Sequence, residues 1–152
     1  MEPEESSSIL KIIDAMRKWK RMDFSLVFRE KLSMPEFTIL NGIERIGAKN
    51  DVVYVSDVAH LFSMSAQAVS KYLKICESRD LVIRETDKKD RRNTKLFLTD
   101  EGRRVLSACE NDLTSFLSSV LDEFDKSEID RMIVLADEIY ERTAKKLEQL
   151  YN

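Results

Sequence analysis

Glycine and proline are scarce in this chain, with three glycines and two prolines among 152 residues. Ordinary usage would give about 12% for the two together, and they build most of the tight turns between short strands. A β-sandwich, a multi-stranded barrel or an enzyme with a glycine-rich phosphate loop is therefore disfavoured. Hydrophobic residues make up 43% of the chain, which is enough to form a buried core. We predict a mainly α-helical globular protein of one domain, with or without arms.

Cysteine usage and hydropathy indicate the compartment. Cys76 and Cys109 cannot form a disulfide framework, and their spacing is not that of metal ligands. The acidic start at Glu2 is unlike a secretory signal, and the longest stretch without Asp, Glu, Lys or Arg has 13 residues, from Val58 to Ser70. About 18 are needed for a membrane span. We predict a cytoplasmic protein that does not bind a membrane, a metal ion or a cofactor.

Charge is unevenly distributed along the chain. Residues 1–59 carry 9 basic and 10 acidic side chains, residues 60–104 carry 11 and 7, and residues 105–152 carry 5 and 11. The net charges are therefore −1, +4 and −6. A basic middle between neutral and acidic ends is expected when one face meets a polyanion such as double-stranded DNA. Ordinary solvated surface is the alternative that charge alone leaves open.

Apolar spacing and capping residues predict the first elements. An amphipathic helix is expected over about Ser7–Leu32, where apolar residues recur mostly every three or four positions. Ser33 and Glu36 have the spacing of a capping box, and the helix they open should end near Gly47. The β-branched run Val52–Val55 predicts a small strand.

The middle of the chain predicts a helix-turn-helix. Ser56 and Asp57 are expected to cap a short helix through Phe62, and Ser65 is an N-cap candidate for a basic helix that ends near Leu81. Two short helices joined by such a turn have the outline of a helix-turn-helix.

A β-hairpin is expected next. The β-prone runs 81–86 and 94–99 flank seven polar residues, 87–93, four of which are cations. A long helix is expected to begin at Thr99, and the last helix is expected to begin at Ser127.

Catalysis is disfavoured by what the chain lacks. With one histidine, His60, it can build neither a histidine-based triad nor a two-histidine zinc site. No phosphate-cradling glycine loop is present. We predict that the protein is not an enzyme and that His60 is a surface residue.

The basic helix and hairpin together suit a DNA duplex. A helix in the major groove reads bases near its N-terminus and anchors on phosphates with serine and lysine. Gln67 has the amide to pair with adenine, and arginines at the hairpin tip suit a narrow minor groove. The polar face of an ordinary surface helix is the alternative. The predicted DNA-binding residues are Ser65, Ala66, Gln67, Ser70, Lys71 and Lys74 in the helix and Lys88, Lys89, Arg91 and Arg92 in the hairpin.

From about Leu32 to Val105 the chain resembles the MarR family of winged-helix transcriptional regulators. The most specific likeness is Asp90-Arg91-Arg92 followed by 98–103 (LTDEGR), which is similar to the family's wing signature and the start of its next helix. Segments 33–37 (SMPEF), 55–59 (VSDVA) and the helix 65–81 are also similar. Any one of these motifs alone is weak, but their order and spacing together are specific.

The resemblance implies a mainly α fold with a two-stranded β-wing, and a homodimer. It divides the chain into an N-terminal dimerisation helix (1–32), a winged helix-turn-helix (33–104) and C-terminal dimerisation helices (105–152). In the dimer the terminal helices interlock, and each subunit offers one winged helix-turn-helix to half of a palindrome. The function implied is sequence-specific transcriptional regulation, with repression favoured. A winged-helix protein-interaction module without DNA binding, suggested by the overall acidity, is the alternative.

The chain departs from the family pattern at three positions. Asp80 stands where glycine usually precedes the leucine that ends the recognition helix, so a differently shaped helix end is expected. Lys71 stands in place of the usual arginine, and a lysine can keep the phosphate contact but loses the bidentate geometry. Cys76 replaces a leucine and is expected in the core.

Two further roles are expected. Asp90 can accept hydrogen bonds from one neighbouring guanidinium and organise the wing, which leaves the other arginine free for the minor groove; the resemblance assigns Arg92 to the motif's final arginine. A small aromatic or amphipathic effector is the default regulatory input that the resemblance implies, with Trp19, Phe24, Phe28 and Tyr72 as candidate pocket residues. Core packing is the alternative for these four aromatic residues, and structural burial rather than redox sensing is favoured for both cysteines.

Overall fold

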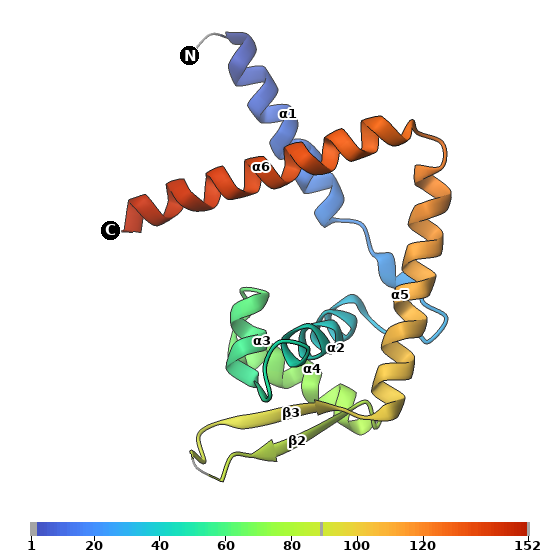
Figure 1. The fold of residues 1–152 in the computed structure, drawn as a ribbon, viewed down its shortest axis with the longest axis vertical. Helices are drawn as coiled ribbons and strands as arrows, with labels where there is room; N and C mark the ends of the chain where they lie inside the picture. Colours follow the sequence, from blue (N-terminus) through green and yellow to red (C-terminus); the bar gives the residue numbers. More distant parts are fainter. Residues whose placement is uncertain (1–2, 89, 152) are drawn as a thin grey trace. The chain divides into compact units, whose positions relative to one another are not determined.

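The computed structural model describes residues 3–88 and 90–151 (Figure 1). Contacts within the chain divide it into two compact units, the first ending at Leu113 and the second beginning at Thr114. The elements are α1 (Pro3–Lys20), the 3-10 helix η1 (Phe24–Val27), α2 (Met34–Gly47), β1 (Val53–Tyr54), α3 (Val55–Leu61), α4 (Ala66–Ser78), β2 (Val82–Thr86), β3 (Thr94–Leu98), α5 (Asp100–Leu121) and α6 (Lys126–Tyr151). The mainly α fold is confirmed, and the predicted division at residues 32 and 104 stays a prediction.

The N-terminal helix is shorter than predicted. Instead of running to Leu32, α1 ends at Lys20, and η1 follows as a separate element. Asp23 caps η1: its carboxylate accepts hydrogen bonds from the Ser25 backbone N–H at 3.0 Å and from the Ser25 hydroxyl at 2.5 Å. Such local bonds from an aspartate give the backbone an alternative to continuing the helix.

The helix that follows begins and ends as predicted. The Ser33 side chain accepts from the Glu36 backbone N–H, and the Glu36 carboxylate accepts from the Ser33 backbone N–H at 2.9 Å, which completes the capping box. The last residue of α2 is Gly47.

Two predicted helix starts are one or two residues too late. Tyr54, not Ser56, is the N-cap of α3, because Asp57 reaches back from the third helical position and accepts from the Tyr54 backbone N–H at 2.8 Å. Asp125 precedes α6, and its carboxylate accepts from the Ser127 backbone N–H at 2.8 Å. In both cases an aspartate two or three residues away takes the capping role.

The wing hairpin is confirmed, but it belongs to a three-stranded antiparallel sheet in the order β1-β3-β2. Strands β2 and β3 pair from Val82 opposite Leu98 to Thr86 opposite Thr94. The expected two-stranded wing omits β1, whose Val53 pairs with Leu96 of β3. This pairing joins the base of the wing to the start of α3.

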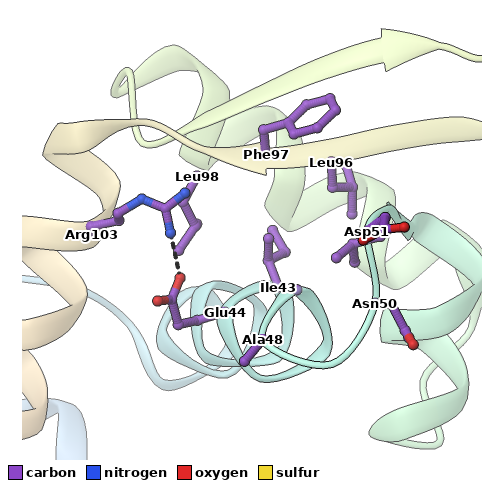
Figure 2. Close-up of a pocket in the computed structure, with 11 residues that line it drawn as sticks. Ile43, Glu44, Ala48, Asn50, Asp51, Leu96, Phe97, Leu98 and Arg103 are labelled. Atoms are coloured by element: carbon purple, nitrogen blue, oxygen red, sulfur yellow. Dashed lines mark hydrogen bonds and ion pairs between the residues drawn. The ribbon is translucent and has the colours of Figure 1, made fainter.

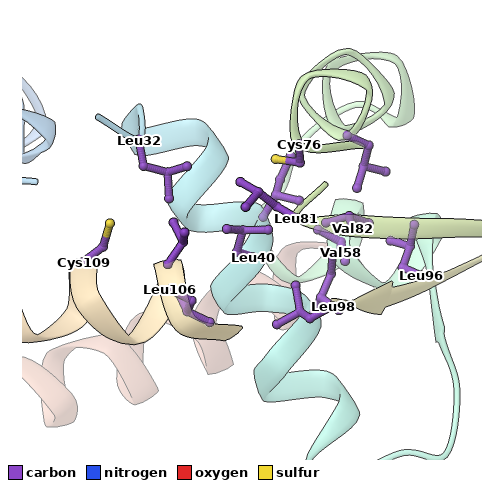
Figure 3. Packing of buried hydrophobic residues seen from close by; sticks show 14 of the residues in the cluster. Leu32, Leu40, Val58, Cys76, Leu81, Val82, Leu96, Leu98, Leu106 and Cys109 are labelled. Carbon is purple, nitrogen blue, oxygen red and sulfur yellow. The ribbon is translucent and has the colours of Figure 1, made fainter. Parts of the chain in front are cut away.

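The core of the first unit lies between α2, α4, the sheet and the start of α5. Figure 3 shows Leu106 and Cys109 of α5 directed toward Leu32 and Leu40, and all four side chains are buried. Val69, Leu73 and Cys76 line the buried face of α4. One face of the helix that is predicted to read DNA is therefore fixed by core packing, and the other face is available to a partner.

Asp80 adopts the left-handed conformation that the family pattern assigns to glycine, with φ of 56°. The Leu81 N–H bonds to the Cys76 carbonyl at 2.9 Å, and the Asp80 N–H bonds to the Glu77 carbonyl at 3.0 Å. This is the Schellman pattern of a helix C-terminus. The expectation of a differently shaped helix end is wrong, because aspartate also visits this region.

Candidate nucleic-acid interface

The predicted recognition helix presents a polar face. Val69 and Leu73 are buried, whereas Gln67, Lys71 and Lys74 are exposed. The Ser65 hydroxyl caps the helix by accepting from the Ala68 N–H at 3.1 Å. Of the predicted helix contacts, Ser70 is half-buried and the others are exposed; the exposed set is Ser65, Ala66, Gln67, Lys71 and Lys74.

The C-terminal end of α4 is held by Arg79. Its guanidinium donates to the Glu36 carboxylate at 3.1 Å and to the Glu30 carbonyl at 3.1 Å. Glu36 is buried. Its carboxylate closes the capping box of α2 and also pairs with Arg79 at the end of α4. This contact fixes the helix relative to the preceding segments, as a reading helix requires.

A cleft of about 280 Å³ separates α4 from the wing. Ala66 and Ser70 line it from the helix, and Arg92 lines it from the hairpin. The structure thus brings three of the predicted DNA-binding residues to one hollow. Its other lining residues are Tyr54, Val55, Ser56, Arg84, Asn93 and Thr94.

At the wing tip, Asp90 binds Arg92. The Asp90 carboxylate accepts from the Arg92 backbone N–H at 3.0 Å and from its Nε at 3.2 Å. These bonds lower the pKa of Asp90 below its usual value. Arg91 is exposed, and within the described residues no ion pair or hydrogen bond of its side chain is present. The arginine that Asp90 orders is therefore Arg92, and Arg91 is the freer of the two.

The two wing lysines differ in what the structure says of them. Lys88 is exposed. Lys89 lies outside the described residues.

The base of the wing contains a polar contact that the sequence pattern did not reveal. Asp87 is 5% exposed, and its carboxylate accepts from the Tyr54 hydroxyl at 2.8 Å and lies 3.4 Å from the Lys95 Nζ. The hydrogen bond to Asp87 raises the pKa of Tyr54. Asp87 belongs to the all-polar run 87–93, which predicted an exposed hairpin tip. Nothing in the neighbouring sequence indicated that this aspartate, unlike the other described residues of the run, is buried. Its contact ties the hairpin to the strand beside α3.

The four candidate effector residues fall into different environments. Trp19 is 58% exposed, and its ring stacks on Phe24 with centroids 6.4 Å apart. Phe28 is 5% exposed and packs on Phe37 at 5.0 Å. Tyr72 packs against the core, with the Lys71 ammonium 5.5 Å from its ring centroid. Core packing accounts for Phe28, and an effector site at the others stays a prediction.

Both cysteines are buried. Burial raises the pKa of Cys76 to about 12 and that of Cys109 to about 11. Because the thiolate is the reactive form, these thiols are poor nucleophiles at neutral pH. This environment favours the structural role expected for them.

Comparisons with known proteins agree with this architecture. A model of the MarR family matches residues 31–93. The chain is 24% identical over 115 residues to the uncharacterized HTH-type transcriptional regulator YpoP of Bacillus subtilis (strain 168), which covers 76% of this chain and 79% of that protein.

Solved structures share the fold over nearly the whole chain. The MarR family transcription regulator SP03579 has a TM-score of 0.79 at 18% identity and covers 95% of this chain and 96% of its own. Staphylococcus aureus MarR, in complex with salicylate and kanamycin, has a TM-score of 0.74 at 18% identity and covers 95% of both chains.

In the described part of the chain, no helix is long and apolar enough to cross a membrane. The helix-turn-helix, the hairpin and its signature residues, the match over residues 31–93 and the shared fold are all similar to those of the MarR family. Residues 31–93 of the chain match the MarR family, and the chain shares the fold of solved MarR family transcription regulators.

Proposed function

We propose that the protein is a sequence-specific DNA-binding repressor that binds a palindromic operator as a homodimer. The observation that carries this proposal is the position of the exposed polar face of α4 and the cationic wing on the two sides of one cleft. A helix in the major groove and a hairpin in the adjacent minor groove fit that arrangement. Such a protein would act in the cytoplasm.

The terminal helices support the homodimer. Many large apolar side chains on α1 and α6 are between 48% and 80% exposed in the single chain, which is unusual for a monomeric surface. They recur at helical spacing, as expected of a face that packs against another helix. They include Ile9, Ile12, Met16 and Trp19 of α1 and Met132, Ile139, Leu147 and Leu150 of α6. A second copy of the chain would cover them.

Release by a small aromatic or amphipathic effector is part of the proposal. The S. aureus relative was solved with salicylate, a small aromatic anion. In this chain the stacked and partly exposed pair Trp19 and Phe24 offers an aromatic surface next to the exposed apolar face of α1.

Duplex binding at two salt concentrations tests the function. The wild-type protein should bind mixed duplex DNA more weakly at the higher salt, and sequences selected from a random pool should contain a palindrome with half-sites about one helical turn apart. Lys71→Ala should weaken binding to all DNA sequences by a similar factor and should lower the slope of log affinity against log salt concentration by about one unit. Gln67→Ala should instead change which DNA sequence is preferred. Absence of duplex binding by the folded wild-type dimer would instead support a protein-interaction module.

Asp90→Ala is expected to weaken operator binding, although it removes a negative charge near the phosphates. Without Asp90, Arg92 loses the hydrogen bonds that its backbone N–H and its Nε donate to that carboxylate. The free energy cost of ordering Arg92 on DNA then weakens binding. Because the pKa of Asp90 is lowered in the folded wing, the bond is present above the ordinary value of about 3.9 and is lost only as pH falls through the lowered pKa.

The measurement is operator affinity of the Asp90→Ala variant at pH 7, with its thermal unfolding as the control for folding. Tighter binding than wild type would mean that the hairpin acts as a flexible cationic arm. Wild-type wing order should not change between pH 8 and about pH 5, since Asp90 stays ionised there.

A further inference from the structure

We propose that the cleft between α4 and the wing binds one phosphate of the DNA backbone and that Arg84 is its principal ligand. The proposal rests on duplex binding as proposed above. When α4 occupies the major groove and the wing occupies the adjacent minor groove, the strand that separates the two grooves passes between them. The cleft lies in that position, with Ser70 on one side and Arg92 on the other.

Strand geometry places Arg84 at this cleft. Side chains alternate between the two faces of a strand: Val82 is buried, Ile83 is exposed and Arg84 is partly buried. Arg84 stands opposite the buried Leu96 of β3, so its side chain leaves the sheet on the face that packs on the helices. There it lines the cleft.

The guanidinium of Arg84 is incompletely paired. In the described part of the chain its Nε is buried and has no hydrogen-bond partner. Its Nη1 lies 3.7 Å from the Glu77 carboxylate, which is longer than a hydrogen bond. A buried N–H without an acceptor is unfavourable, so this site has unused capacity for an acceptor. A phosphate oxygen is an acceptor that suits the planar donor fork of arginine.

The remaining lining of the cleft suits the same ligand. Ser56 and Ser70 carry hydroxyl groups, Asn93 carries an amide, and Arg92 adds a second guanidinium. These groups donate to phosphate oxygens in protein–DNA complexes. The lining residues include no carboxylate, and the two charged side chains among them, Arg84 and Arg92, are both cationic.

Glu77 is the internal competitor for Arg84. It lies on α4, and 48% of its side chain is exposed, compared with 23% for Arg84. A phosphate bound at Arg84 meets this negative charge. Removal of the charge should therefore strengthen DNA binding, and this effect is opposite to that expected from removing Arg84.

The first experiment measures operator affinity at several salt concentrations for Arg84→Met, Arg84→Lys and Glu77→Gln. The controls are Arg103→Met and Glu44→Gln, which remove the same charges from another arginine–glutamate pair, joined at 2.6 Å beside a separate cavity (Figure 2). Arg84→Met should weaken binding about tenfold and lower the salt slope by about 0.9. Arg84→Lys should restore part of the affinity, and Glu77→Gln should increase it above wild type.

Each contrary outcome of this experiment has a defined meaning. Equal effects of Arg84→Met and Arg103→Met would overturn the proposal, because only net charge would then matter. If thermal unfolding shows that Arg84→Met does not fold, Arg84→Lys and Glu77→Gln decide between a phosphate contact at Arg84 and an effect of net charge alone. If no protein, including wild type, binds duplex DNA, the proposed function itself fails; if wild type and Lys71→Ala behave as expected and the Arg84 and Glu77 variants do not, only this inference fails.

The second experiment identifies the source of the phosphate. Operators are made in which one phosphate at a time is replaced by a neutral methylphosphonate. At one position the replacement should weaken binding by wild type but should not further weaken binding by Arg84→Met. If no such position exists but inorganic phosphate competes with the operator at constant ionic strength through Arg84, the cleft takes a free oxyanion, and the DNA-backbone assignment is wrong.

Discussion

Gly102→Ala is expected to destabilise the winged domain by about 3 kcal/mol or more, at or beyond the upper end of ordinary overpacking. A Cβ at Gly102 would lie 2.0 Å from the Leu81 carbonyl oxygen and 3.0 Å from the Leu81 carbonyl carbon. These are backbone atoms, and the same oxygen accepts from the Thr99 N–H at 3.2 Å. The added methyl group therefore cannot be accommodated by a side-chain rotation, and the start of α5 must move away from the end of α4.

Urea denaturation of Gly102→Ala beside Gly47→Ala measures this effect. At Gly47 a Cβ would meet only the Val53 side chain at 3.6 Å, an ordinary contact, so alanine in this helix should be neutral or stabilising by up to about 1 kcal/mol. Since a domain has about 5–15 kcal/mol of stability in total, the Gly102 variant should unfold at a much lower urea concentration. Equal midpoints for the two variants would show that the close approach at Leu81 is not rigid.

Ile139→Glu is expected to abolish dimerisation and to reduce operator affinity by at least a hundredfold. Ile139 is 54% exposed in the single chain, so a monomer would tolerate glutamate there. In the proposed dimer the same face of α6 is covered by the partner, and an unpaired charge buried in both subunits costs several kcal/mol. A monomer offers one recognition helix, and binding to a palindrome loses the contribution of the second half-site.

Val134→Glu is the matched control. Val134 is 57% exposed, so the two substitutions remove similar apolar surface and add the same charge. It lies five residues before Ile139, about 140° away around an α-helix, away from the face shared by Met132, Ile139 and Leu150. Sedimentation should give a dimer for wild type and Val134→Glu and a monomer or unfolded chain for Ile139→Glu. Dimers of equal stability for both variants would contradict the assigned face.

Local interactions explain what could be predicted. The capping box of Ser33 and Glu36 joins residues three apart, and the hairpin follows from two β-prone runs around a polar loop. Helix starts were missed where an aspartate near the predicted first residue takes the capping role, as Asp125 does beside Ser127. The predicted helix to Leu32 was wrong because its apolar period continued past Asp23, where a local hydrogen bond begins η1 instead.

The sequence by itself determined the order of elements, the basic middle and the polar face of the predicted recognition helix, because periodicity, capping and charge are properties of neighbouring residues. Only the tertiary structure decided which charged side chains are paired and where they lie. Tyr54 meets Asp87 across 33 residues, and Arg79 meets Glu36 across 43. In the sequence Arg84 is one more charge in a strand, and folding places its guanidinium 3.7 Å from the Glu77 carboxylate of α4. The energies of such distant pairs depend on burial and geometry, and the chain acquires both only when it packs.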